Sequence, residues 1–368
     1  MSAFRWSRAP ASPPSALSAV VFRWDLDKTY LKTEFEHVRD LVRIPFQEAR
    51  DKVAAPGVTE LIRGLRRFNQ ASGREVKVYF LSASPPQIGR AIREKLELDG
   101  IEYDGITFKD QLQNLVRGKF RNLREHVGFK LTELLRSRRE MPPESREILF
   151  GDDWESDPFV YSLYADILAC RVDRALVHDL LEAIRVDPVL IADVKRLMGG
   201  HDPEDVVKRI CINLDRRTPP AHFRSFGARL VPTFNYFQTA ASLYADGMLD
   251  LEGVAAVAQS LLESSSYSPE KLRNSLADVE RRGHLVPSVA GTLREHLRMQ
   301  KLVAGGGRPR EVEGASLWTR LLSWIQPPLP PGSEEPMQID YRALMEEWRP
   351  ARGAGAASAP KTSAEKRS

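Results

Sequence analysis

The sequence predicts an α/β fold, in which a parallel sheet with helices on both faces is followed by a mainly helical C-terminal region. Two observations lead to this prediction. Strand-like and helix-like segments alternate through the first half of the 368 residues, which is typical of βαβ units and a parallel sheet. Beyond about residue 186 the segments are helix-like, with few strand signals between them.

Local patterns indicate the individual elements. Short apolar runs indicate strands, and apolar residues three and four positions apart indicate helices. Strands are expected at 19–24, 75–81, 101–108, 146–150 and 166–172, and helices at 57–68, 85–98 and 129–139. In the second half, helices are expected at 206–214, 237–249, 253–265, 269–283 and 288–300.

These elements divide the chain into five expected parts. Glycines and prolines between residues 305 and 336 favour a break in the chain. The tail from about residue 351 has a composition that forms no core. The expected parts are a flexible N-terminus at 1–17, an α/β domain at 18–185, a helical domain of unknown role at 186–303, a linker with short helices at 304–350, and a disordered tail at 351–368.

The composition argues against several classes of protein. The two cysteines, Cys170 and Cys211, lack metal-ligand spacing, so neither a cysteine metal site nor a disulfide framework is expected. The N-terminus does not read as a signal peptide, and no apolar run is long enough for a membrane span. We therefore expect a cytoplasmic protein. The net charge of +4 is compatible with an anionic substrate without requiring one.

Polar side chains follow the ends of three expected strands. Asp25 and Asp27 come directly after the first strand, and a serine and a group of aspartates come after two others. The carboxyl ends of parallel strands meet at one edge of a sheet, so these side chains are expected to lie together. A lysine that opens a nearby helix is expected at the same edge. The full set is Asp25, Asp27, Ser82, Lys130, Asp152, Asp153 and Asp157.

This set of side chains suits phosphoryl transfer. Several crowded carboxylates call for a hard divalent cation with oxygen ligands, and Mg²⁺ is the natural choice. One carboxylate can form an aspartyl-phosphate, while the metal and the lysine stabilise charge on the phosphoryl oxygens. A second carboxylate two residues further along an extended chain points the same way. It can protonate the leaving oxygen and later activate water.

The motifs resemble those of the haloacid dehalogenase (HAD) superfamily of phosphatases. They are D-x-D-x-T at 25–29, a serine after the second strand, a lysine, and G-D-x-x-x-x-D at 151–157. The resemblance covers about residues 18–175 and implies a Rossmann-like HAD sheet, so 18–185 would be the phosphatase domain. Four segments, 55–65, 81–88, 129–135 and 151–161, look like the catalytic domain of the actin-patch-type phosphatidate phosphatases.

The resemblance implies a role for each site residue. The catalytic set would be Asp25 as nucleophile, Asp27 as general acid/base, Thr29 bracing the nucleophile loop, Ser82 holding a phosphoryl oxygen, and Lys130 neutralising the phosphoryl group. The Mg²⁺ ligands would be Asp25, the backbone carbonyl of Asp27, and Asp152, with Asp157 or Asp153 completing the outer ligation.

Some of these residues have simpler explanations. Asp157 before Pro158 is also a good N-cap with proline at the first helical position. Asp153 could be a solvated turn residue. The basic run at 117–124 reads equally well as a solvated face or as an anion-attracting rim.

The sequence departs from the family pattern at two places. Arg23 and Trp24 precede the expected nucleophile, where the family has a smooth apolar run, and Pro86 stands where the family tends to have tryptophan. These departures leave the expected chemistry intact and concern the substrate.

The sequence therefore predicts a Mg²⁺-dependent phosphomonoesterase acting on a large substrate, with phosphatidate favoured by the resemblance. Two other classes are kept: a non-enzymatic scaffold that binds a protein partner through its helical half, and a nucleic-acid-end phosphatase, although nucleic acid is the less favoured partner. Residues 316–326 could form a helix that contacts a membrane surface, but docking of this helix on the protein's own core is favoured.

Overall fold

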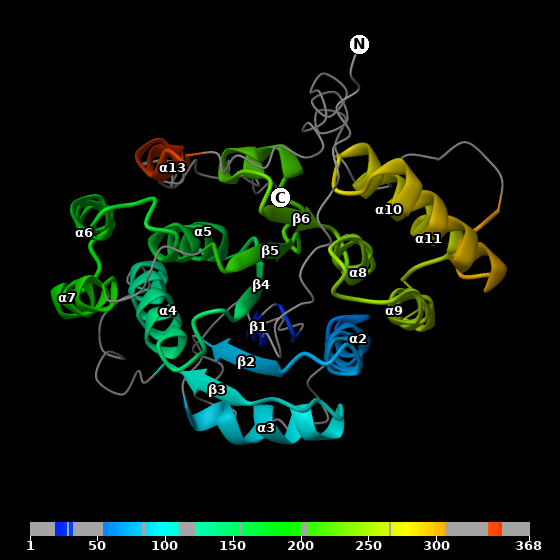
Figure 1. The fold of residues 1–368 in the computed structure, drawn as a ribbon, viewed down its shortest axis with the longest axis horizontal. Helices are drawn as coiled ribbons and strands as arrows, with labels where there is room; N and C mark the ends of the chain where they lie inside the picture. The colour runs from blue at the N-terminus through cyan, green and yellow to red at the C-terminus, as the bar shows by residue number, and fades with distance from the viewer. Residues whose placement is uncertain are drawn as a thin grey trace, which may run out of the picture.

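The fold is a parallel sheet covered by helices on both faces, as the sequence predicts (Figure 1). The computed structural model describes residues 19–27, 29–31, 54–82, 86–109, 122–154, 156–199, 205–264, 266–305 and 338–347. Among these residues, no helix is both long and apolar enough to cross a membrane. The predicted fold class is confirmed.

Six strands of the described residues form one sheet in the order β3-β2-β1-β4-β5-β6. Every neighbouring pair is parallel. The carboxyl ends of all six strands therefore lie at the same edge of the sheet. The strands are β1 (Val20–Asp25), β2 (Val76–Ser82), β3 (Gly105–Phe108), β4 (Arg146–Asp152), β5 (Val207–Asn213) and β6 (Leu230–Thr233).

Helices connect the strands and cover the two faces of the sheet. Those of the first half are α2 (Val58–Ala71), α3 (Gly89–Leu98), α4 (Asn122–Arg138), α5 (Asp157–Leu168), α6 (Arg174–Ala183) and α7 (Pro188–Leu197), with the short 3₁₀ helix η2 (Pro86–Ile88) before α3. Those of the second half are η3 (Pro220–Phe226), α8 (Tyr236–Ala245), α9 (Leu251–Glu263), α10 (Pro269–Arg281), α11 (Pro287–Met299) and α13 (Tyr341–Glu347).

Two apolar cores lie on opposite faces of the sheet because successive side chains of a strand alternate between faces. In β4, Ile148 and Phe150 belong to the core beneath α2, α3, α8 and α9, whereas Leu149 belongs to the core beneath α4, α5, α6 and α7. Figure 1 shows these two groups of helices on either side of the strands. Helices α10 and α11 pack on the outside of α8 and α9.

Two expected elements are wrong. Residues 206–214 were expected to be helical but form β5. The apolar residues here have the spacing of a helix face: Val207, Ile210, Cys211 and Leu214. A strand with apolar residues on both faces gives the same sequence pattern, and β5 contributes to both cores. Residues 166–172 were expected to be a strand, but α5 continues to Leu168. Every residue of α5 is buried, and a fully buried helix gives an apolar run like that of a strand.

The expected domain boundary at residue 186 does not coincide with an edge of the sheet. Strands β5 and β6 lie beyond it and extend the sheet from β4. Helices α8 and α9 share one core with β1 and α2. The helices expected at 237–249, 253–265, 269–283 and 288–300 do form, as α8 to α11, and α8 and α9 cover the same sheet.

Several expectations fall on residues that the structure does not describe. They concern the N-terminus at 1–17, the interfacial helix at 316–326 and the tail at 351–368. The basic run at 117–124 also lies outside the residues whose side chains are described.

The two residues that depart from the family pattern before Asp25 are both buried and packed within the fold. The Trp24 ring stacks on the Phe150 ring, with centroids 3.6 Å apart. On the opposite face, Arg23 Nε donates to Glu147 Oε2 at 2.7 Å, and a second guanidinium nitrogen donates to Oε1 at 3.1 Å. Burial alone would lower the pKa of Arg23, but the Glu147 carboxylate more than offsets this and raises the pKa above its ordinary value.

The Arg23–Glu147 pair yields a prediction about stability. We expect Arg23→Met or Glu147→Leu alone to lower the free energy of unfolding by about 3 kcal/mol, because each removes the bidentate partner of a buried charge. The double variant Arg23→Met/Glu147→Leu removes both groups and should cost less than either single variant. Urea unfolding of the four proteins measures the difference; additive losses would show that the two residues act independently.

Candidate metal and phosphoryl-transfer site

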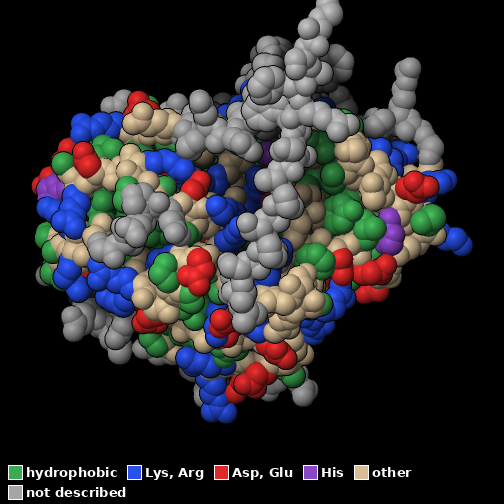
Figure 2. Space-filling view, viewed as in Figure 1, with side chains coloured by type: hydrophobic (Ala, Val, Ile, Leu, Met, Phe, Trp, Pro, Cys, Tyr) green, Lys and Arg blue, Asp and Glu red, His purple; other side chains and the backbone are tan. Residues whose placement is uncertain are grey.

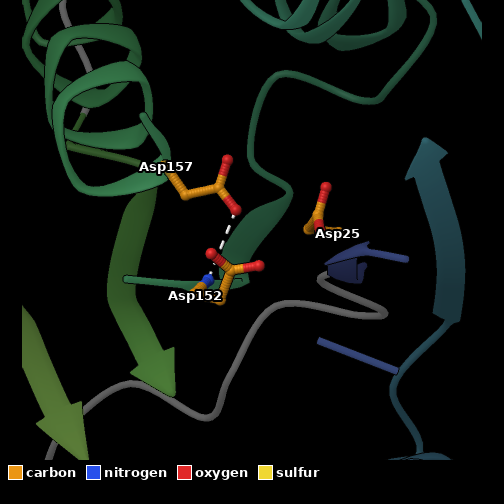
Figure 3. Close-up of side chains that lie close together, drawn as sticks. All are labelled: Asp25, Asp152 and Asp157. Atoms are coloured by element: carbon orange, nitrogen blue, oxygen red, sulfur yellow. Dashed lines mark hydrogen bonds between the residues drawn. The ribbon is translucent and has the colours of Figure 1, made fainter. Parts of the chain in front are cut away.

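Three carboxylates converge at the carboxyl edge of the sheet. Asp25 ends β1, Asp152 ends β4 and Asp157 begins α5. All three are buried, and one oxygen from each lies within 4.8 Å of the others. Figure 3 shows the three side chains directed toward a common space between the two strands and the helix. The parallel sheet thus brings together residues that are up to 132 positions apart, from Asp25 to Asp157.

Lys130 joins two of these carboxylates. Its ammonium donates to Asp25 Oδ1 at 2.7 Å and to Asp157 Oδ1 at 2.6 Å, and all three side chains are fully buried. The lysine reaches the sheet edge from α4, which packs against α5. Because the ammonium is a compact point charge, it can hold two carboxylates together at a position where burial disfavours them.

Asp157 and Gly151 fix the geometry around Asp152. Asp157 Oδ2 accepts the backbone N–H of Asp152 at 3.3 Å, as the dashed line in Figure 3 shows. The expected N-cap role of Asp157 is wrong: Ser156 is the N-cap residue and Asp157 is the first residue of α5. Its carboxylate is therefore directed to the cluster. An added Cβ at Gly151 would lie 2.5 Å from Asp157 Oδ2, so only glycine fits there.

Asp27 and Ser82 form a second polar contact beside the cluster. Ser82 ends β2 and its hydroxyl donates to Asp27 Oδ2 at 2.8 Å. Asp27 is partly exposed, whereas Asp25 and Ser82 are buried. A carboxyl at this position has the access to solvent that exchange of a proton with a leaving group or water requires.

Thr29 lies in the loop after β1 and is fully buried. Its carbonyl accepts the hydroxyl of Tyr236 at 2.6 Å, and its own Oγ1 has no hydrogen-bond partner among the described residues. A buried hydroxyl of this kind is costly unless a ligand or water pairs with it. The contact with Tyr236 ties the loop that carries Asp25 to the start of α8.

Asp153 lies outside the carboxylate cluster. Its two oxygens accept the backbone N–H groups of Arg216 at 2.8 Å and of Thr218 at 3.0 Å. These bonds attach the loop after β5 to the end of β4. Asp153 therefore positions this loop, and its oxygens are not among those grouped at the cluster of Asp25, Asp152 and Asp157.

The charge of the cluster acts on two nearby phenols. Burial, and after it the negative charge of Asp157, raises the pKa of Tyr161 well above its ordinary value. Burial, and after it Asp152 and Asp25, does the same for Tyr236. Both phenols are therefore neutral hydrogen-bond donors at ordinary pH.

The donor set fits a hard divalent cation. Three buried carboxylates supply oxygen ligands, and they face one ammonium, so negative charge remains in excess when all are ionised. Mg²⁺ prefers oxygen donors and carboxylates in particular. Asp25, Asp152 and Asp157 are the described residues that would hold such an ion.

Sequence reasoning missed three residues at this edge. Lys109 follows β3, is only 8% exposed, and donates its backbone N–H to the Ser82 carbonyl at 3.1 Å. The search for polar residues after each strand would have found it. Trp154 and Tyr236 act through partners distant in the sequence, and no local pattern marks them.

Gly151 allows a direct test of the packing around Asp157. We expect Gly151→Ala to lower the free energy of unfolding by about 1–3 kcal/mol, because the new methyl group displaces the Asp157 carboxylate. The matched control is Gly291→Ala in α11, where nothing lies within 4 Å of the added Cβ. It should be neutral or stabilise the protein by about 0.5–1 kcal/mol. Equal effects of the two changes on urea unfolding would contradict the close approach at Gly151.

Comparison with known proteins supports the family resemblance. Residues 24–179 match the family model described as phosphatidate phosphatase APP1, catalytic domain. The match includes the acidic cluster and Lys130 and ends before β5. No match was found among curated proteins. Residues 24–179 of this chain are therefore related to the catalytic domain of phosphatidate phosphatase APP1. This relationship indicates that the chain is a hydrolase of the phosphatase class.

Proposed function

We propose that this protein is a Mg²⁺-dependent phosphatase that hydrolyses a phosphomonoester through an aspartyl-phosphate on Asp25, with phosphatidate as the favoured substrate. The observation that carries the proposal is the buried set of Asp25, Asp152 and Asp157 with Lys130. The choice of phosphatidate follows from the family match alone.

In the first step, an oxygen of Asp25 attacks phosphorus and the bond from phosphorus to the ester oxygen breaks. Lys130 donates to Asp25 Oδ1 and positions the carboxylate for this attack. The protonated carboxyl of Asp27 gives its proton to the leaving oxygen. The hydrogen bond from Ser82 holds Asp27 for this role in the free protein.

In the second step, the Asp27 carboxylate takes a proton from water, and the oxygen of that water attacks phosphorus. The bond between phosphorus and Asp25 breaks, which restores the carboxylate and releases inorganic phosphate. A bound Mg²⁺ would supply electrostatic stabilisation of the phosphoryl oxygens. Lys130 supplies a second positive charge at the same place.

The surface around the site suits an anionic substrate. Figure 2 shows Lys and Arg side chains over much of this face, several of them near its centre. Positive charge around a concave site raises the local concentration of anions.

Phosphate release tests the proposed reaction. We expect activity on phosphatidate vesicles that is abolished by EDTA and falls on the order of 10³-fold or more in Asp25→Asn. The matched control is Asp193→Asn, which removes a carboxylate of α7 that pairs with Arg196 on the surface. Normal turnover by Asp25→Asn would refute the mechanism. Activity only on soluble esters or nucleic-acid ends would remove phosphatidate, and no activity on any ester would favour a scaffold.

Metal binding can be tested without turnover. We expect Mg²⁺ in large excess over its Kd to raise the Tm of the wild-type protein by several degrees, since binding to the folded state alone stabilises it. Asp152→Asn should lose most of this rise, and Asp193→Asn should keep it. A rise of the same size in all three proteins would place the ion elsewhere.

A further inference from the structure

Trp154 is an exposed aromatic side chain beside the acidic cluster. It lies two residues after Asp152 and donates its backbone N–H to Asp152 Oδ1 at 2.6 Å. The residue is 43% exposed, which makes it one of five large apolar residues exposed among those described. Most large aromatic rings of this fold are buried in its cores, so an exposed indole at the edge of the site calls for an explanation.

The Trp154 ring is held in place by two neighbours on the loop after β5. Its indole Nε1 donates to Asp215 Oδ2 at 2.7 Å. The Arg216 guanidinium carbon lies 5.0 Å from the ring centroid, within cation–π distance. An exposed ring fixed in this way loses little conformational freedom when it binds a ligand.

The loop itself is attached to the site by Asp153. Its carboxylate accepts the backbone N–H groups of Arg216 and Thr218. Arg217, between them, has a φ of 58°, in the left-handed region. The side chains of Arg216 and Arg217 are exposed, and neither forms an ion pair with a carboxylate of the described residues. Residues 215–217 therefore carry two positive charges and one negative charge, with Asp215 and Arg216 against the indole and Arg217 exposed on the same loop.

We propose that Trp154, Arg216 and Arg217 form the edge through which the site contacts an anionic lipid surface. The indole enters the interfacial layer, and the two guanidiniums contact lipid phosphates. This inference rests on the proposed function, because it names the surface that presents the substrate to Asp25. The contact brings the carboxyl edge of the sheet to the lipid headgroups.

A lipid surface fits this edge better than a phosphopeptide does. Tryptophan is enriched where apolar and aqueous phases meet, because its ring is amphipathic. Basic side chains near an anionic leaflet each add to the attraction. A peptide would instead be held by pockets or by a free strand edge, whereas here the exposed groups stand together on a loop.

Vesicle co-sedimentation tests the proposal without using turnover. The probes are vesicles of zwitterionic lipid and vesicles that also contain phosphatidylserine, which carries no phosphomonoester. We expect wild-type protein to prefer the anionic vesicles. Arg216→Ser and Arg217→Ser should each weaken this binding about fivefold, and Trp154→Ala should weaken it further. Failure of the phosphatase reaction would leave this result unchanged, so the two proposals can fail separately.

The matched control is Arg185→Ser. Arg185 is an exposed arginine with a φ of 60°, on the loop between α6 and α7. The substitution Arg185→Ser removes the same charge as Arg217→Ser, from a residue with the same backbone conformation, and should not change vesicle binding. Equal losses in Arg185→Ser and Arg217→Ser would overturn the proposal, because they would show a general effect of net charge. Equal binding to both kinds of vesicle, or retention on phosphopeptides in place of vesicles, would also overturn it.

Fluorescence quenching gives a second readout, measured at a lipid concentration that binds both proteins fully. Lipids brominated near the headgroup quench an indole that enters the interfacial layer. We expect a quenched component in the wild-type protein that is absent in Trp154→Phe, which keeps a ring at this position. Identical quenching of the two proteins would place the contact elsewhere.

Discussion

The contact of Lys130 with Asp25 and Asp157 is the interaction on which the site depends. Buried carboxylates are unstable in an apolar interior unless a cation and hydrogen bonds compensate them. Here one ammonium joins the end of β1 to the start of α5, and the Asp157 carboxylate continues to the backbone of Asp152 at the end of β4. These contacts join four elements at one point: the strands β1 and β4 and the helices α4 and α5. When all three carboxylates are ionised, negative charge remains in excess at this point, which is compatible with binding of a divalent cation.

The second half of the chain supports this arrangement rather than standing apart from it. Tyr236 at the start of α8 donates to the Thr29 carbonyl in the loop after Asp25. Strand β5 pairs with β4 up to Asp152 and Asn213, so the strand that ends in Asp152 is central in the sheet. A central strand is held by hydrogen bonds on both sides, which limits the movement of its end. The family match stops at residue 179, yet the rigidity of the matched residues depends on contacts beyond it.

Much of the site could be predicted from the sequence, because parallel strands place their ends together. Asp25, Ser82 and Asp152 each follow an apolar run, and that pattern alone assigns them to one edge. Lys130 was expected at the same edge because the sequence pattern placed it at the opening of a nearby helix, and the resemblance added its role. It lies instead in the middle of α4 (Asn122–Arg138), so its place at the edge was predicted correctly but its place in the helix was not. Strand β5 was missed because Val207, Ile210, Cys211 and Leu214 have helical spacing. The contacts of Trp154 with Asp215 and of Tyr236 with Thr29 join distant segments, and local patterns carry no information about such pairs.

Two positions that depart from the family pattern, Arg23 and Trp24, have their partners inside the fold. Arg23 and Trp24 are compensated inside the fold, by Glu147 on one face of the sheet and by Phe150 on the other. Both side chains are therefore part of the packing behind Asp25, away from the carboxylate cluster. Trp154 lies inside the matched residues, but the two neighbours that orient it, Asp215 and Arg216, lie outside them. The carboxylates are thus held by elements inside the matched residues, whereas Trp154 is oriented by a loop outside them. A loop at a sheet edge can change without disturbing the strands that hold the carboxylates.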